Sequence, residues 1–129
     1  RTFILAEVGK TVDRNDLFRS TGHAYIQIAK NEPHIFRMYL FQERKNVSSL
    51  DDIYCSETNP NVSKIIAENL NISISAAKRL HLNMLIYTIG IGTIYSVTSS
   101  SISEAEIFNQ QELAYEAFLK QALEDNRNE

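Results

Sequence analysis

The three histidines are the side chains in this sequence best suited to acid–base or metal chemistry. His23, His34 and His81 fall in separate predicted helices, and none has a second histidine or a carboxylate at the spacing of an HExxH or ExxH metal site. The sequence shows no Ser-His-Asp order, no glycine-rich phosphate loop and no pair of carboxylates in an apolar setting. We therefore expect no enzyme activity, no metal and no cofactor. His81, at the start of a long helix, is expected either to have a structural role or to meet a ligand.

Aromatic side chains form a second group with chemical potential, because a buried phenol needs a hydrogen-bond partner and a ligand can supply one. Two interpretations stay open. The aromatic residues form a plain core, or they line an apolar pocket with a few hydroxyls for a small molecule between helices. The residues in question, all in helices that should pack together, are Tyr25, Phe36, Tyr39, Phe41, Tyr87 and Tyr95.

Residues 65–80, with the sequence IIAENLNISISAAKRL, resemble a helix-turn-helix, with a small Ala67 in the first helix and a tight turn at Asn71–Ser73. In that interpretation the side chains facing bases and phosphates are Ser75, Lys78 and Arg79. Two features oppose it: the second helix continues well beyond a recognition helix, and the net charge of −3 with a pI near 5.6 gives no basic face. Direct DNA binding through residues 65–82 is kept as an alternative to a helix hairpin within a bundle.

From Leu80 to Ser103 the chain carries no formal charge, and Gly90 and Gly92 lie in the middle of this run. A membrane span is disfavoured, since the densest apolar part, residues 84–97, is shorter than the roughly 20 residues required and has polar ends. Each glycine weakens a helix by roughly 1 kcal/mol relative to alanine, which suggests close approach by another backbone or a ligand. We expect this helix to be buried on several sides, one of them against a second subunit.

The elements that must position these residues are all predicted helices. At 129 residues, with four Gly and two Pro, the chain fits one all-α domain, an antiparallel bundle of five to six helices. Apolar residues at three- and four-residue spacing and helix-capping residues such as Ser103 predict the boundaries. The expected helices span residues 17–31, 34–44, 59–70, 74–97 and 103–123, with a polar connection over 45–58 and a solvated tail over 124–129.

Two segments of the chain resemble a known protein family. The run GHAYIQIAKNEPHIFRMYLF (22–41) is similar to a segment of the regulatory domain of TetR-family transcriptional regulators. The later MLIYTIGIGTIYSV, the serine-rich loop and SEAEIFNQQELAYEAFL resemble that domain's last two helices. The resemblance covers most of residues 17–122. It implies that residues 1–129 are a single effector-binding and dimerisation domain of a cytoplasmic bacterial regulator, in most cases a repressor. The DNA-binding helix-turn-helix would precede Arg1, and operator DNA would be contacted only through it.

The resemblance also implies a homodimer in which the last two helices form an intermolecular four-helix bundle, with no membrane partner. A small, largely apolar effector would bind among the preceding helices. The implied interface residues are Tyr87, Gly90, Ile91, Ile94, Tyr95, Phe108, Gln111, Tyr115 and Phe118. The expected ligand-binding residues are Tyr25, Phe36, Tyr39, Ile66, His81, Met84 and Tyr87. A helical protein-interaction module without a ligand is the second alternative.

Overall fold

The computed structural model describes residues 17–40, 42–98 and 101–129, and within these ranges the regular structure is helical, without a strand. The prediction of an all-α helical bundle is therefore confirmed. Phe41, expected in the aromatic set, lies outside the described residues. In chain order the helices are α2 (Leu17–Asn31), α3 (Pro33–Leu40), α4 (Leu50–Glu57), α5 (Pro60–Leu70), α6 (Ile74–Val97) and α7 (Glu104–Arg127).

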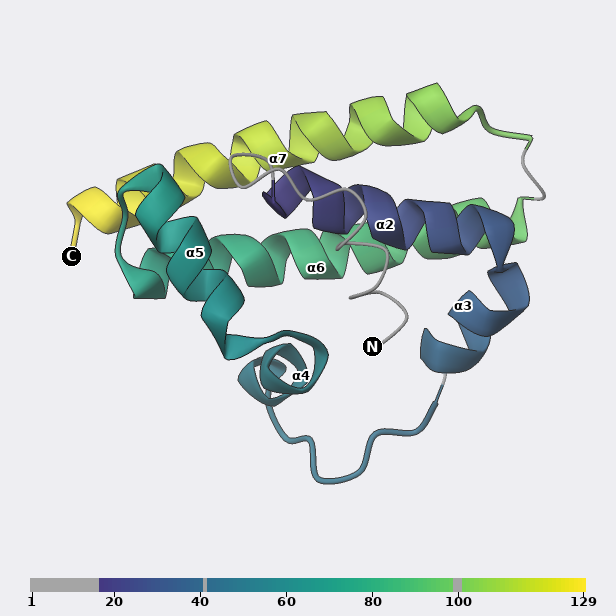
Figure 1. Cartoon of the computed structure of the whole chain (residues 1–129), viewed down its shortest axis with the longest axis horizontal. Helices are drawn as coiled ribbons and strands as arrows, with labels where there is room; N and C mark the ends of the chain where they lie inside the picture. The colour runs from purple at the N-terminus through teal and green to yellow at the C-terminus, as the bar shows by residue number, and fades with distance from the viewer. Residues whose placement is uncertain (1–16, 41, 99–100) are drawn as a thin grey trace.

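Helix α6 is the centre of the bundle, and α2, α3, α5 and α7 all pack against it. Figure 1 shows α2 and α6 running in the same direction, with α7 returning antiparallel to both. Polar contacts hold one end of this arrangement. Lys30 near the end of α2 donates to Glu104 at the start of α7 over 2.7 Å. Arg37 of α3 donates to the Ser96 carbonyl oxygen over 2.7 Å, which satisfies an acceptor in the last turn of α6.

The structure confirms three residues that were predicted to cap helix starts: Asn59, Ser73 and Ser103. Each side-chain oxygen accepts a hydrogen bond from a backbone N–H in the first turn, which stabilises a helix by roughly 0.5–2 kcal/mol. The predicted break between α5 and α6 is confirmed too, since Asn71 adopts a left-handed conformation (φ 55°) that ends α5. At the three caps, Asn59 accepts from the Asn61 N–H (2.9 Å), Ser73 from the Ala76 N–H (3.0 Å) and Ser103 from the Glu106 N–H (3.1 Å).

Helix α4 was not expected, because residues 45–58 were predicted to be a polar connection. That prediction is wrong for residues 50–57, which form a helix capped by the Ser49 hydroxyl, with Asp51 and Asp52 in its first turn. Acidic residues are favourable at that end of the helix dipole. Only Tyr54 and Glu57 are buried from this eight-residue helix, so it packs little apolar surface against the rest of the bundle. The serine cap followed by two acids was the one local signal.

Two helix ends also differ from the prediction. The helix beginning at Pro33 ends at Leu40 rather than near Arg44, because Arg44 turns back to donate to the Tyr39 carbonyl oxygen (3.3 Å) and to Glu57. The last helix continues to Arg127 instead of ending in a tail from Glu124. Its last turns contact the start of α6: Asp125 accepts from Arg79 (3.2 Å), and Asn126 accepts from the Ser73 backbone N–H (2.8 Å).

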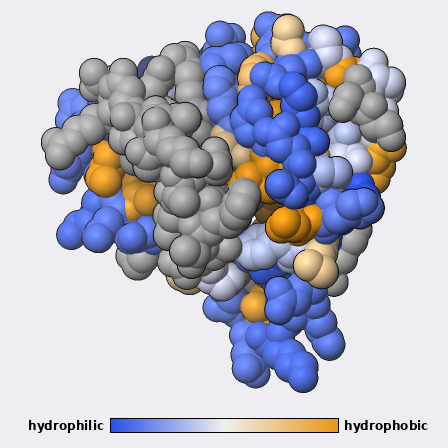
Figure 2. Space-filling view, turned by 45° about the vertical axis from the view of Figure 1, so that its right-hand side comes forward, coloured by the Kyte–Doolittle hydropathy of each residue, from blue (hydrophilic) through white to orange (hydrophobic). Residues whose placement is uncertain are grey.

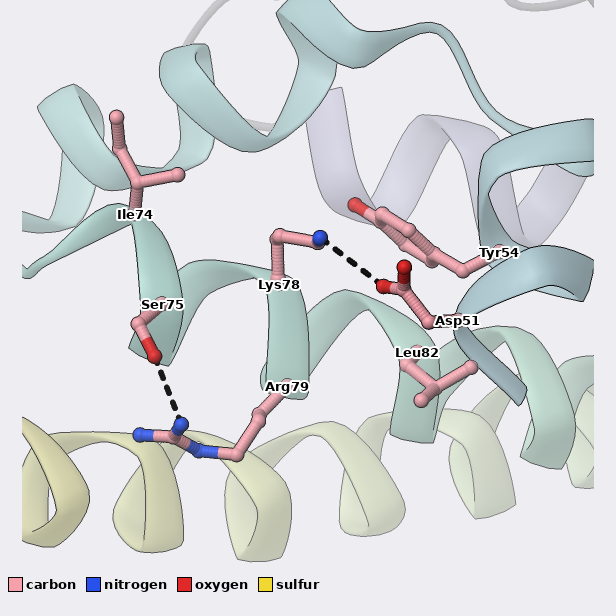
Figure 3. A pocket seen from close by; sticks show the side chains of 7 residues that line it. All are labelled: Asp51, Tyr54, Ile74, Ser75, Lys78, Arg79 and Leu82. Carbon is pink, nitrogen blue, oxygen red and sulfur yellow. Dashed lines mark hydrogen bonds and ion pairs between the residues drawn. The ribbon is translucent and has the colours of Figure 1, made fainter. Parts of the chain in front are cut away.

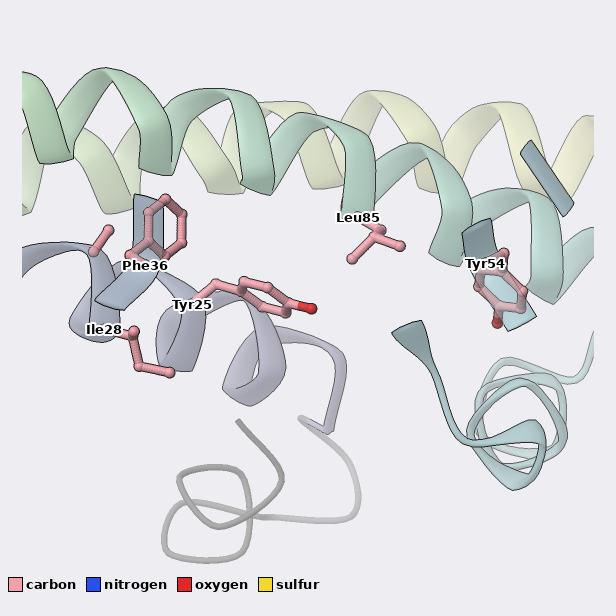
Figure 4. Packing of buried hydrophobic residues seen from close by; sticks show 6 residues of the cluster. Tyr25, Ile28, Phe36, Tyr54 and Leu85 are labelled. Atoms are coloured by element: carbon pink, nitrogen blue, oxygen red, sulfur yellow. The ribbon is translucent and has the colours of Figure 1, made fainter. Parts of the chain in front are cut away.

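Among the residues that the structure describes, the core forms three apolar clusters, and α6 contributes to every one. The first joins α2, α3, α4 and α6 around Phe36 and Leu85 (Figure 4). The second joins α5, α6 and α7 around Leu80 and Met84, and the third joins α2, α6 and α7 around Ile26 and Tyr95. By length and composition α6 could cross a membrane, but half of its most apolar window is buried inside the bundle. This arrangement is compatible with the core helix of a soluble protein.

Candidate functional site

The seven predicted ligand-binding residues do not gather in one place. Tyr25 and Phe36 belong to the first cluster, where both are almost fully buried. Ile66 and Met84 lie in the second cluster, between α5, α6 and α7. Figure 4 shows Tyr25, Phe36 and Leu85 between α2 and α6, with Tyr54 at α4 further along α6. Of the remaining three, His81 contacts Tyr54 of the first cluster, whereas Tyr39 lies next to Glu57 and Tyr87 lies edge-on to Phe118 with ring centroids 6.3 Å apart.

The polar centre of the first cluster is a contact between Tyr54 of α4 and His81 of α6. The Tyr54 hydroxyl and His81 Nδ1 are 2.7 Å apart, and the two rings meet edge-on at 5.1 Å. Both side chains are buried, with relative exposures of 4% and 6%. Burial lowers the pKa of His81 to about 4, and burial also raises the pKa of Tyr54. The imidazole is therefore neutral at neutral pH, which suits a structural or ligand-facing role and not a cationic one.

The neutral state of His81 predicts a loss of stability in mild acid. The unfolded chain, whose histidine has a pKa near 6.5, takes up the proton first as the pH falls. Stability from this residue is therefore present above about pH 6.5 and declines toward pH 4, by about 2 kcal/mol between pH 7.5 and pH 5. Urea unfolding at the two pH values should show this slope. In His81→Gln the slope should largely disappear, and an unchanged slope would contradict the assignment.

A second polar cluster links the end of α3 to the end of α4. Glu57, whose side chain is only 3% exposed, accepts hydrogen bonds from the Tyr39 hydroxyl and from the Arg44 guanidinium. Arg44 also lies over the Tyr39 ring, 5.4 Å from its centroid. Burial, followed by the bond to Glu57, raises the pKa of Tyr39 to about 12. Tyr39, predicted as a ligand contact, is thus committed to this cluster, whose other two members were not anticipated.

One face of α6 carries apolar residues that reach solvent. Ile86, Gly90, Ile94 and Val97 follow one another at helical spacing, and we call them the α6 stripe. The three side chains are 49%, 53% and 61% exposed, respectively. The face drawn in Figure 2 shows separate apolar patches, in orange, among polar side chains. Exposed apolar residues in a row on a helix are typical of a surface that binds another protein.

The predicted interface residues divide into three groups by burial. Gly90 and Ile94 are exposed on the α6 stripe. Tyr87, Ile91, Phe108, Tyr115 and Phe118 are partly buried. The prediction needs correction at Tyr95 and Gln111, which are only 3% and 4% exposed. Their side chains pack inside the chain and present no surface to a partner.

Tyr95 and Gln111 are buried because other helices of the same chain cover them. Tyr95 packs with Ile26 and Ile107. The Gln111 amide donates to the Gly22 carbonyl oxygen (3.2 Å) and to the Thr88 hydroxyl (3.3 Å), which ties α7 to α2 and α6. A polar residue in this position holds the helices of one chain together.

The two glycines of α6 have different surroundings. A Cβ atom at Gly92 would lie 2.7 Å from Cζ of Phe36, so the expected close approach occurs there, against a side chain of the same chain. A Cβ at Gly90 would meet nothing within 4 Å. The expected close approach at Gly90 is therefore not made within the chain, and it stays a prediction for a second molecule. Its open position on the α6 stripe leaves room for a second molecule.

The residues of the helix-turn-helix alternative pair with carboxylates. Lys78 Nζ donates to Asp51 Oδ1 over 3.0 Å, and Arg79 donates to Asp125 and to Ser75. The helix that would read DNA continues to Val97 as the core of the bundle. Both facts favour the helix hairpin over a DNA-reading helix.

Within the described ranges, no group of three or more His, Cys, Asp or Glu side chains is placed to hold a metal ion. Comparison with known proteins gave no match to any family model, curated protein or solved structure.

Proposed function

We propose that this chain is the ligand-sensing and dimerisation domain of a TetR-type bacterial transcriptional regulator. In this proposal α6 and α7 pair with their copies around a two-fold axis, and a small, largely apolar effector binds on the α2–α3–α4 side of α6. The effector would change operator binding by a helix-turn-helix that is not part of this sequence. The resemblance of residues 22–41 and of the last two helices motivates the proposal.

The observation that carries the proposal is the α6 stripe. Ile94 and Val97 are more than half exposed on a helix that is otherwise the core of the bundle. An isologous dimer would bury this stripe against the same stripe of a second copy, a common solution for apolar helix faces. The open position of Gly90 supports close approach at its centre, because a glycine lets two helix backbones come near each other.

Regulation requires that the ligand side of the bundle be connected to the dimer side. Two contacts supply such connections. Arg37 of α3 donates to the Ser96 carbonyl at the end of α6, and Lys30 of α2 donates to Glu104 at the start of α7. A ligand that binds one arrangement of α2 and α3 more tightly would shift the equilibrium toward it. A differential affinity of about 1–3 kcal/mol is sufficient for useful regulation.

The oligomeric state tests the proposal directly. We expect light scattering after gel filtration to give twice the 14.7 kDa chain mass for the wild type. Ile94→Glu should give a single chain mass, because it places a charge against its own symmetry copy, and Gly90→Glu should do the same or aggregate. The matched control is Ile65→Glu, at an isoleucine on α5 that is 37% exposed, which should stay dimeric. A monomeric wild type, or a dimeric Ile94→Glu, would refute the proposed interface.

The second candidate is a helical protein-interaction module without a small-molecule ligand. It is favoured by the division of the predicted ligand residues between two packed clusters, with Tyr25, Phe36 and Ile66 each less than 5% exposed. The two candidates differ in one result. An effector must change operator affinity in the full-length regulator, whereas an interaction module has no compound that does so.

A further inference from the structure

A separate pocket of about 460 Å³ lies between α4 and the first turns of α6 (Figure 3). Its volume is within the range of small-molecule sites in proteins. No residue of the α6 stripe lines it, and none of the seven predicted ligand-binding residues does. The pocket is lined in part by Ser75, Lys78 and Arg79, the side chains that would face DNA if residues 65–82 were a helix-turn-helix.

One part of the pocket wall is apolar. Tyr54, Ile74 and Leu82 contribute it from α4 and α6. Ile74 is the first residue of α6 and is 49% exposed, an uncovered branched side chain beside a hollow. Tyr54 is held in place by its hydrogen bond to the buried His81. This wall is therefore suited to a flat or branched hydrocarbon group.

The other part of the wall is cationic. Lys78 and Arg79 line the pocket with one carboxylate, Asp51, so the charged lining has a net positive charge. Figure 3 shows Lys78 extending toward Asp51 and Tyr54, whereas Arg79 lies back along α6 toward Ser75. The first turn of α6 adds the positive end of its helix dipole.

Both cations have hydrogen-bonding capacity to spare. The Lys78 ammonium has three N–H donors, and Asp51 accepts one bond from it, at 3.0 Å. The Arg79 guanidinium has five N–H donors and uses two, one to Asp125 and one to Ser75. Side-chain exposures of 40% for Lys78 and 64% for Asp51 make their ion pair a weak one, which a ligand can replace.

We propose that this pocket binds a small amphipathic carboxylate, with its carboxylate on Lys78 and Arg79 and its hydrocarbon body against Ile74, Leu82 and the Tyr54 ring. Asp51 then acts against binding, because it competes for Lys78 and repels the anion. The site does not depend on the proposed function, since it concerns neither the α6 stripe nor operator binding. Bound to α4 and α6 together, such a ligand bridges two helices of the bundle.

The test is titration of the isotope-labelled chain with 1-naphthylacetate, followed by backbone amide resonances. We expect shifts concentrated in α4 and the first turns of α6, and weaker binding as salt rises. Two ligands of the same shape are the controls: 1-naphthylacetamide, which is neutral, and 2-(1-naphthyl)ethylamine, which is cationic. Both should bind at least about tenfold more weakly, because neither offers an anion to the two cations.

Substitutions at Lys78 and Asp51 should change the Kd for 1-naphthylacetate in opposite directions. Lys78→Gln should raise the Kd for 1-naphthylacetate about tenfold, and the control Lys64→Gln, at an exposed lysine on α5, should leave it unchanged. Asp51→Asn should lower the Kd several-fold, a gain that damage to the fold cannot produce. Equal affinity for the three compounds, shifts outside α4 and the start of α6, or an unchanged Kd in Lys78→Gln would each overturn the proposal. The wild-type dimer measurement is independent of all these outcomes.

Discussion

Replacing Arg44 by methionine is expected to lower the free energy of unfolding by about 3 kcal/mol, because it leaves the buried Glu57 carboxylate without its cation. The Glu57 side chain is 3% exposed, so its carboxylate depends on protein donors, Arg44 among them, for its stabilisation. The Tyr39 hydroxyl still donates to the carboxylate, and Arg44 is itself 26% exposed, so the loss should fall at the lower end for buried pairs. Urea unfolding followed by circular dichroism measures this difference.

Two further variants separate this cause from a general effect of substitution in the loop. Lys45→Met, at the exposed neighbour, should change stability by less than about 0.5 kcal/mol. The double variant Arg44→Met/Glu57→Leu should recover much of the loss, since two apolar side chains bury no unpaired charge. If Arg44→Met is as stable as Lys45→Met, the cluster does not hold α3 and α4 together.

Replacing Gly92 by alanine is expected to destabilise the chain by about 1–3 kcal/mol, although alanine is the better helix former. The added Cβ would lie 2.7 Å from Cζ of Phe36, whose ring is 3% exposed and packed in the first cluster. The matched substitution is Gly90→Ala, where nothing lies within 4 Å of the new Cβ in the single chain. There the gain in helix propensity, up to about 1 kcal/mol, should be seen in the monomer.

Thermal unfolding of the two alanine variants compares them under one set of conditions. If steric crowding is the cause, a second substitution, Phe36→Leu, should offset part of the Gly92→Ala loss, because the shorter side chain leaves space for the Cβ. Equal stabilisation by both alanines would show that the Phe36 ring moves aside at little cost. A loss in Gly90→Ala only at concentrations that favour the dimer would instead indicate crowding between two chains.

Much of the fold could be predicted from the sequence, because helix starts and stops are local. A serine or asparagine cap needs only a backbone N–H two or three residues away, and Asn59, Ser73 and Ser103 all have one. Elements that depend on distant contacts were missed. Helix α4 buries little beyond Tyr54 and Glu57, and the last turns of α7 contact Arg79 and the Ser73 backbone, which are about fifty residues away in sequence.

The candidate sites were less predictable, for the same reason. Arg44, at the end of a predicted helix, and Glu57, in a segment expected to be a loop, are thirteen residues apart, and nothing in their spacing indicates that they meet. In the sequence, Lys78 and Arg79 suggest contacts to DNA within a helix-turn-helix. The pocket that they line also requires Asp51 and Tyr54 of the unexpected helix α4. A side chain's role in a site depends on which other elements pack beside it.

The uncharged run over residues 80–103 is sufficient to predict a long apolar helix, and the pattern of the whole sequence is sufficient to predict an all-α fold. Helical periodicity and caps carry that information within a few residues. Which sides of α6 are covered depends on the packing of distant helices and cannot be read from the pattern. Tyr95 is buried against α2 and α7, whereas its neighbour Ile94 is 53% exposed, although both are large and apolar. Consecutive residues on a helix point about 100° apart, so the helices packed around α6 select its core face and leave the α6 stripe in solvent.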